Sequence, residues 1–296
     1  MPDRRVWLWR VGAEIVHRVR EHDLMMMAAA IAFYWLLGLI PLLLLGTSAV
    51  GYLLGSSDRA ADDVMAAAFR FVPQVTGPEV GRFLSTLIRS RHITGVLGIG
   101  GLLWAGMGSF GIITSSLTAL TGGRESRSFV RRKLIAFVLM CMAGFLLVVA
   151  LLAGWALAAW PNVEELLGVE IILPAFVMDP DFPRYTAAIL MASLLTVVYR
   201  VAPARDIGWP AAMAGATVAA LLWHGTKLAF NWFVLHYSRI SLFFGIFTGF
   251  IVLVLWIFCT AIILLFGGIL ADIFDRGRRP QEPAADSVLG KFSNIG

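Results

Sequence analysis

Charged residues are scarce in this chain of 296 amino acids: Asp, Glu, Lys and Arg make up 15%, and hydrophobic residues 59%. An ordinary soluble domain contains about 25% charged and roughly 45–50% apolar residues. A soluble fold of this length has too little interior to bury so much apolar surface. The sequence also lacks a polar block long enough to fold separately, so it predicts a single membrane domain.

Cysteine is nearly absent as well. Cys141 and Cys259 both lie inside apolar segments, where a thiol behaves as a small hydrophobic group. These two residues argue against a disulfide framework or a cysteine metal site. Residues 1–23 lack the apolar core of a cleavable signal peptide, because arginines and acidic residues are mixed along them. We therefore expect the N-terminus to stay on the side of the membrane where it is made.

Motifs of hydrolytic and cofactor chemistry are missing. The five histidines form no H-E-x-x-H arrangement, no serine lies in G-x-S-x-G, and no phosphate-binding loop occurs. Gly106, Gly108 and Gly111 match the dinucleotide pattern G-x-G-x-x-G, but that pattern needs a preceding strand and a helix that opens at the glycines. Here they lie inside a long apolar segment, where glycine favours close helix packing. We expect no catalytic residue, no metal and no cofactor.

Six long apolar stretches dominate what is present. About 20 helical residues span the roughly 30 Å hydrocarbon core, and lipid forces backbone polar groups to pair within the segment. The sequence predicts an all-α integral membrane protein with six transmembrane helices at 24–54, 93–120, 134–160, 185–201, 207–235 and 242–273. Pro41 removes a backbone donor inside the first helix and is expected to kink it near Leu37.

The distribution of Lys and Arg predicts the orientation. With the N-terminus in the cytoplasm, five basic residues precede residue 24, five lie in the loop 121–133, Arg200 and Arg205 lie at and just beyond the end of the fourth segment, and four occupy the C-terminal tail. The opposite side holds five in its first loop and two elsewhere. By the positive-inside rule, both termini face the cytoplasm of a bacterial inner membrane. Because membrane orientation accounts for the net charge of +5, no nucleic-acid partner is expected.

Two polar regions show helical periodicity. In the N-terminal arm, residues 1–23, an apolar stripe lies beside a charged ladder of Arg10, Glu14, Arg18 and Glu21. The arm is either an amphipathic helix at the membrane interface or a solvated cytoplasmic helix. In the first outside loop, the sequence predicts an amphipathic surface helix from Pro78, and 58–72 could form a second. The tail 276–296 lacks periodicity and is expected to be flexible.

Polar residues inside the fifth segment are the clearest candidates for substrate binding. His224, Lys227 and Asn231 share a helical face, and charge within a membrane segment is costly. In one interpretation, Lys227 extends its amine to the outer interface. In the other, this face lines a cavity for an anionic headgroup together with Tyr34 and Arg200, where the cations attract its charge.

Small residues are concentrated in the first half of the fifth segment and in two G-x-x-x-G pairs, Gly51–Gly55 and Gly245–Gly249. Such residues let helix backbones approach closely in a membrane. We expect packing between helices of one chain, and a homodimer through one of these faces is an alternative.

Several stretches together resemble the YihY/BrkB family of bacterial inner-membrane proteins. They are AAAIAFYWLLGLIPLL at 28–43, YRVAP at 199–203, WPAA at 209–212, and LLW at 221–223 followed by Lys227 and Phe230. The similarity extends from about Arg18 to Asp275. It implies a six-helix membrane protein and, by analogy alone, transport of lipids.

The family has carried two inherited names, a virulence factor and a ribonuclease. The name ribonuclease is best interpreted as a misassignment, because this sequence lacks the histidine and aspartate cluster of a metal-dependent ribonuclease. The last segment departs from the family's Gly-Ala-Glu-Leu, since this chain has Gly267-Gly268-Ile269-Leu270. Asp272 lies three residues beyond the missing acid, so a pairing role is not carried over to it.

The sequence favours a non-enzymatic protein that binds or transports an anionic, lipid-like amphiphile, with membrane lipids as its partners. The alternative is a structural or assembly factor of the envelope with no transported substrate. A third hypothesis, a membrane-associated ribonuclease, predicts RNA cleavage that needs a divalent metal.

Overall fold

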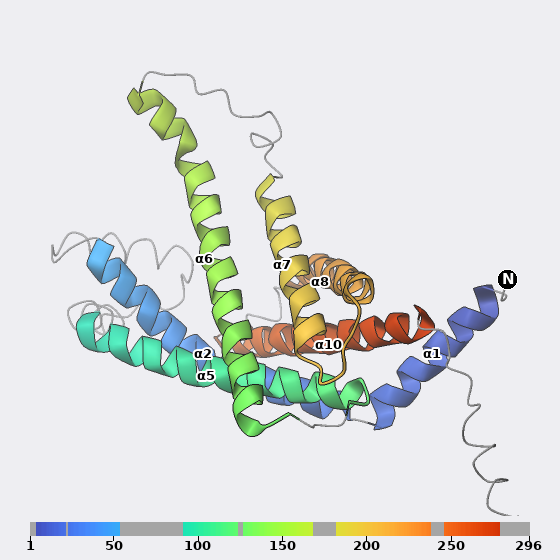
Figure 1. Ribbon diagram of the computed structural model, residues 1–296. Helices are drawn as coiled ribbons and strands as arrows, with labels where there is room; N and C mark the ends of the chain where they lie inside the picture. The colour runs from blue at the N-terminus through green and yellow to red at the C-terminus, as the bar shows by residue number, and fades with distance from the viewer. Residues whose placement is uncertain are drawn as a thin grey trace, which may run out of the picture.

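The computed structural model describes residues 4–21, 23–53, 91–123, 127–167, 182–237 and 246–278 (Figure 1). Every regular element within them is an α-helix, which confirms the all-α class for the described part of the chain. The helices are α1 (Arg4–Glu21), α2 (Leu24–Leu53), α5 (Arg91–Leu120), α6 (Phe129–Leu167), α7 (Phe182–Val201), α8 (Trp209–Tyr237) and α10 (Ile246–Arg278).

Four helices are long and apolar enough to cross a membrane. They contain the stretches Leu24–Gly46, His92–Leu120, Phe129–Gly154 and Gly249–Arg278. In α7, the apolar stretch Tyr185–Val201 is shorter. In α8 the length suffices, but His224, Thr226 and Lys227 interrupt the apolar run. Two of the six predicted segments therefore fall short of a span in the described chain, one by length and one by hydropathy.

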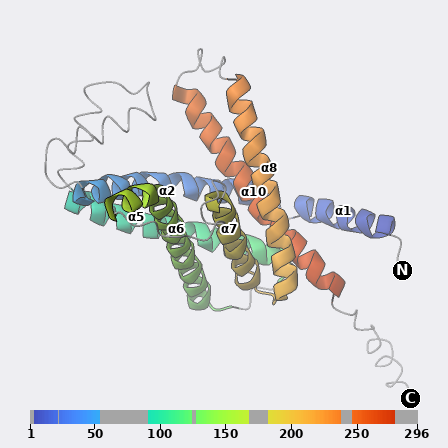
Figure 2. The same ribbon diagram turned by 90° about the horizontal axis from the view of Figure 1, so that it is seen from above.

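Three pairs of helices diverge from a common end of the molecule (Figures 1 and 2). α2 lies along α5, α6 runs beside α7, and α8 lies along α10. The starts of α2, α6 and α8 meet the ends of α5, α7 and α10 at this end, which we call the pole. Successive helices therefore run alternately away from the pole and toward it.

The buried core is concentrated near the pole. The large, fully buried hydrophobic side chains come from α2, α5, α6, α7, α10 and the α7–α8 connection: Ile31, Ile113, Leu117, Leu120, Leu139, Tyr199, Ile207, Leu265 and Ile269. The Tyr199 hydroxyl donates a hydrogen bond to the Leu264 carbonyl at 2.8 Å, so the one polar atom of this large side chain is satisfied inside the core.

α8 approaches α10 through small residues. Ala212, Ala216 and Ala219 are fully buried. A Cβ atom on Gly215 would lie 2.6 Å from the Gly267 carbonyl oxygen and 2.7 Å from the Ala271 Cβ atom. The two backbones can come this close only because Gly215 has no side chain. The prediction of close intramolecular packing is confirmed for this face.

The glycine pattern of α5 also serves packing. A Cβ atom on Gly106 would lie 2.5 Å from the Met140 sulfur of α6, and one on Gly108 would overlap the Tyr34 ring of α2. Both glycines therefore lie within helix contacts, in agreement with the packing interpretation of G-x-G-x-x-G. Gly111, the third glycine, has no neighbouring atom within 4 Å of an added Cβ.

The N-terminal arm is helical and its last turns are attached to the pole. Ile15 and Val19 pack against the core, and Arg18 is only 7% exposed. Burial of Arg18 argues against a helix solvated on all sides. Its location at a membrane interface stays a prediction.

Other expectations are left open. The surface helices predicted at 58–72 and 78–89 lie outside the described residues, as does the tail from 279 onward. α2 continues as a helix through Pro41, whose ring faces α5: a Cβ atom on Gly101 would lie 2.9 Å from the Pro41 Cβ atom. The kink at Pro41 stays a prediction.

Replacing Gly215 by Ala should lower the midpoint of thermal unfolding in detergent, because the added methyl group meets the backbone of α10. We expect a loss of about 1–3 kcal/mol, as for other overpacked cores. Gly225→Ala is the matched control on the same helix, since nothing lies within 4 Å of its added Cβ. Equal midpoints for both variants would contradict the packing argument.

Candidate functional site

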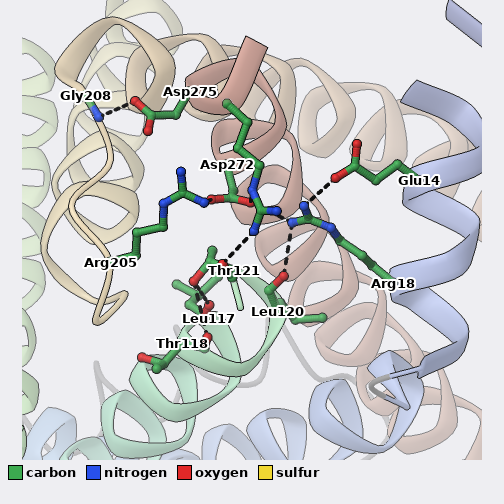
Figure 3. A network of polar contacts seen from close by, with 11 residues as sticks. Glu14, Arg18, Leu117, Thr118, Leu120, Thr121, Arg205, Gly208, Asp272 and Asp275 are labelled. Atoms are coloured by element: carbon green, nitrogen blue, oxygen red, sulfur yellow. Dashed lines mark hydrogen bonds and ion pairs between the residues drawn. The ribbon is translucent and has the colours of Figure 1, made fainter. Parts of the chain in front are cut away.

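A buried carboxylate lies at the centre of the pole. Asp272 of α10 is 0% exposed and pairs with three arginines (Figure 3). Its Oδ2 atom lies 2.7 Å from a terminal nitrogen of Arg18 and 2.8 Å from Nε of Arg276, and its Oδ1 atom lies 3.3 Å from a terminal nitrogen of Arg205. These partners come from α1, from α10 itself and from the α7–α8 connection. We call these four residues the Asp272 cluster.

Two of the arginines also bond the end of α5. Arg18 donates to the Leu120 carbonyl at 3.2 Å, and Arg276 donates to the Thr121 carbonyl at 3.0 Å. The last carbonyls of a helix have no partner within it and carry partial negative charge, so cations are favourable there. Glu14, one turn before Arg18 on α1, accepts a further hydrogen bond from that arginine. The cluster therefore joins four segments that are distant in the sequence.

A second carboxylate holds the start of α8. Asp275 is buried, and its Oδ1 atom accepts a hydrogen bond from the Gly208 amide at 2.8 Å. Free amide groups and a partial positive charge at a helix N-terminus favour a carboxylate there. α10 is thus connected to the α7–α8 segment twice, through Arg205 and through Gly208.

Arg127 binds the free carbonyl groups at the end of α7 and just beyond it. It donates to the carbonyls of Val201 at 3.1 Å and Pro203 at 2.6 Å. Burial lowers the pKa of Arg127, repulsion by Arg131 lowers it further, and attraction by Asp206 opposes both. Because an arginine pKa normally exceeds 12, we expect the side chain to stay protonated at neutral pH.

A pocket of about 310 Å³ lies between α2, α5 and the start of α6. Its lining residues are Tyr34, Gly108, Gly111, Ile112, Ser115, Phe129, Arg132 and Lys133. The four residues from α5 follow at spacings of three, one and three, so they form one helical face. Its two glycines carry no side chain, and in particular the space beside Gly111 stays open.

The pocket combines cations with apolar walls. The Arg132 guanidinium carbon and the Lys133 amine lie 5.6 Å and 5.8 Å from the centre of the Phe129 ring. Of the described residues that line the pocket, none is acidic. Ser115 donates its proton to the Ile112 carbonyl at 3.0 Å, so its oxygen can still accept a hydrogen bond. Lys133 and Phe129 are exposed, hence the pocket opens to the outer surface of the helices.

The five residues predicted to bind substrate lie in three places. Tyr34 lines this pocket, with its ring against Gly108. Arg200 bonds the Ile207 carbonyl and lies 5.9 Å from the Trp209 ring centre at the start of α8. Lys227 follows Trp209 by eighteen positions, or about 27 Å along a helix. The structure therefore does not bring Arg200 to Lys227, because Arg200 of α7 lies beside the start of α8 and Lys227 lies in the second half of α8.

His224, Lys227 and Asn231 are all exposed on α8. The Lys227 amine lies 5.7 Å from the Trp223 ring centre, in a cation–π contact on the same helix. Both interpretations of these three residues, contact with a substrate and extension to an interface, stay predictions.

Sequence reasoning missed both the Asp272 cluster and most of the pocket. Arg18, Arg205 and Asp272 are separated by many segments, so no local motif connects them. The sequence assigned no pairing role to Asp272, yet this residue pairs with three arginines. The sequence did contain a signal for the pocket. Gly111 and Ser115 lie on one helical face, and the basic pair Arg132 and Lys133 follows at the start of the next helix.

The molecule has apolar helices of spanning length, small residues where α8 packs on α10, and a pole built around a buried ion pair. These features define a multi-pass helical membrane protein. The chain belongs to a family described as virulence factor BrkB, whose family model matches residues 15–288. The expected family resemblance is therefore confirmed. No solved structure matches the chain.

Several bacterial proteins are similar to the chain over most of its length. The chain is 26% identical to the putative ribonuclease-like protein YfkH of Bacillus subtilis, over 91% of this chain and 97% of the relative. It is 23% identical to a UPF0761 membrane protein of Tolumonas auensis, over 93% and 91%. It is 21% identical to one of Chromobacterium violaceum, of which it spans 64%. The word ribonuclease occurs in a name that belongs to the Bacillus protein.

Replacing Asp272 by Asn should destabilise the protein strongly, because three arginines at the pole lose their shared counter-charge. Breaking a buried ion pair by removing one partner costs about 3–5 kcal/mol. Thermal unfolding in detergent measures the effect. Asp206→Asn is the control, because Asp206 is exposed and lies 4.0 Å from its partner Arg200. A shift for Asp272→Asn no larger than for this control would show that the cluster contributes little.

Proposed function

We propose that this protein crosses the membrane six times and binds an anionic amphiphile in the pocket between α2, α5 and α6, from which it moves the molecule across the membrane. The observation that carries the proposal is the combination found in this pocket. Two cations lie at its rim, while Phe129, Ile112 and the Tyr34 ring supply apolar walls. A site of this kind matches a ligand with a charged head and a hydrocarbon part.

The depth of the pocket supports a ligand from the membrane. Tyr34 lies ten residues beyond the start of α2, about 15 Å along the helix, and Ser115 lies five residues before the end of α5, about 8 Å. The pocket therefore extends from the pole into the part of the helices that hydrocarbon would surround. A water-soluble anion would not need these apolar walls.

The charge distribution supports an orientation. Lys and Arg are concentrated in four regions of the sequence. The described parts of these regions are the end of α1, the α5–α6 connection, the α7–α8 connection and the end of α10, and they meet at the pole. By the positive-inside rule, the pole would face the cytoplasm. The pocket would then accept its ligand from the inner leaflet.

α7 and α8 are the two spans that need support from their surroundings. The apolar part of α7 is short, and a short hydrophobic stretch is accommodated by local thinning of the bilayer or by flanking residues. In α8, Lys227 can extend toward an interface. Both helices pack against neighbours that are long and apolar enough to cross a membrane, so we include α7 and α8 among the six transmembrane helices.

Filling the pocket should stop transport without unfolding the protein. Gly111→Leu places a side chain into open space that borders the site. We expect the rate at which purified protein moves a fluorescent anionic phospholipid across proteoliposomes to fall about tenfold or more, since the ligand loses its volume and contacts.

Gly100→Leu is the matched control on the same helix, because its added Cβ also meets nothing within 4 Å and Gly100 does not line the pocket. Its rate should equal that of the wild type. Equal rates for both leucine variants would remove the pocket from the mechanism. A wild-type protein that moves no labelled lipid but co-purifies with a stoichiometric partner would instead support an assembly factor.

A further inference from the structure

The size of the pocket limits which part of an amphiphile it can hold. Pockets that enclose small ligands measure about 300–1,000 Å³, and this one, at about 310 Å³, lies at the lower limit. Such a volume suits a headgroup better than a pair of acyl chains. The hydrocarbon part of a lipid must therefore remain outside the pocket.

An apolar surface for that hydrocarbon lies next to the cations. Phe129 is 65% exposed, and Val130, Leu134 and Phe137 are exposed farther along α6. The last three follow at spacings of four and three, so they form one helical face. A lipid with its head between Arg132 and Lys133 could lay a chain along this face within the bilayer.

The charge of the pocket selects among headgroups. Arg132 and Lys133 bring two cationic side chains to one small volume, and no described residue of the lining is acidic. Arg132 has a further interaction of its own, and the five N–H donors of a guanidinium allow it to bind a ligand as well. A phosphomonoester carries about −1.5 to −2 charges at pH 7, whereas the phosphodiester of most phospholipids carries a single one. Arginine binds phosphate through paired hydrogen bonds and lysine acts as a point charge. Two adjacent cations therefore match a phosphomonoester more closely than a phosphodiester.

We propose that the pocket binds the phosphomonoester headgroup of a membrane lipid, with Arg132 and Lys133 on the phosphate and the acyl chains on the exposed face of α6. This inference rests on the proposed function and names the class of its substrate. Tyr34 lies on the α2 side of the same space, and its hydroxyl group can donate a hydrogen bond to a phosphate oxygen. Ser115 lies on the α5 side, with its proton donated to the Ile112 carbonyl.

Lipid binding to the full chain in nanodiscs tests the headgroup. The matrix is phosphatidylcholine, and the probes are phosphatidic acid, a phosphomonoester, and phosphatidylglycerol, a phosphodiester. We expect phosphatidic acid to bind about tenfold more tightly, which corresponds to about 1.4 kcal/mol. Lys133→Gln should remove most of this preference, and Lys133→Arg should retain it because the positive charge remains.

Arg131→Gln is the matched control. Arg131 is the exposed residue directly before this pair and does not line the pocket, so its loss should leave the preference unchanged. Unfolding midpoints of the three variants, measured in the same nanodiscs, should equal that of the wild type, since both positions are exposed.

Other outcomes overturn the inference. Equal affinity for phosphatidic acid and phosphatidylglycerol would overturn the inference and leave the proposed function intact. An Arg131→Gln variant that loses the preference as much as Lys133→Gln would also overturn it, because general surface charge would then explain the binding. Glycerol 3-phosphate that competes as strongly as the lipid would assign the site to a soluble phosphate. If no anionic lipid binds or moves, the proposed function fails as well.

Discussion

A single buried carboxylate holds the polar end of this protein together. Asp272 lies at 0% exposure, and three arginines from three parts of the chain converge on it. Burying Asp272 or Arg18 alone would cost several kcal/mol or more, and attraction repays that cost only when geometry and additional hydrogen bonds are good. The carbonyls of Leu120 and Thr121 supply such bonds. Asp272 and Arg18 can be buried only together, while Arg205 and Arg276 reach Asp272 from partly exposed positions, and this makes the arrangement of the four segments specific.

The pocket depends on the helix that this cluster holds. α5 ends at the carbonyls that Arg18 and Arg276 bond, and the preceding turns carry Gly111 and Ser115 on its pocket face. Because α5 is a rigid helix, fixing its end also fixes the position of this face against α2 and α6. Glycine has opposite uses along the helix: Gly108 lets Tyr34 pack closely, while Gly111 leaves space unfilled.

Much of the fold could be predicted because it depends on local properties. The lengths of the apolar runs predicted the helices, and the described bounds differ from them by a few residues at most ends, as for Leu24–Leu53 against 24–54. The start of α6 at Phe129 lies five residues before the predicted one, because the charges of Arg131, Arg132 and Lys133 indicate a loop although helices tolerate such residues well. Of the candidate site, Tyr34 was predicted and its neighbours were not.

The sequence by itself determined the class of protein, the apolar segments and the uneven placement of Lys and Arg, since composition and periodicity act within one segment at a time. Only the tertiary structure decided that Asp272 pairs with Arg18, 254 positions away, and that Arg200 lies beside the start of α8, far from Lys227 in its second half. Periodicity carries no information about which distant side chains will meet. That is decided by how the helices pack, where charges can be buried only beside a partner.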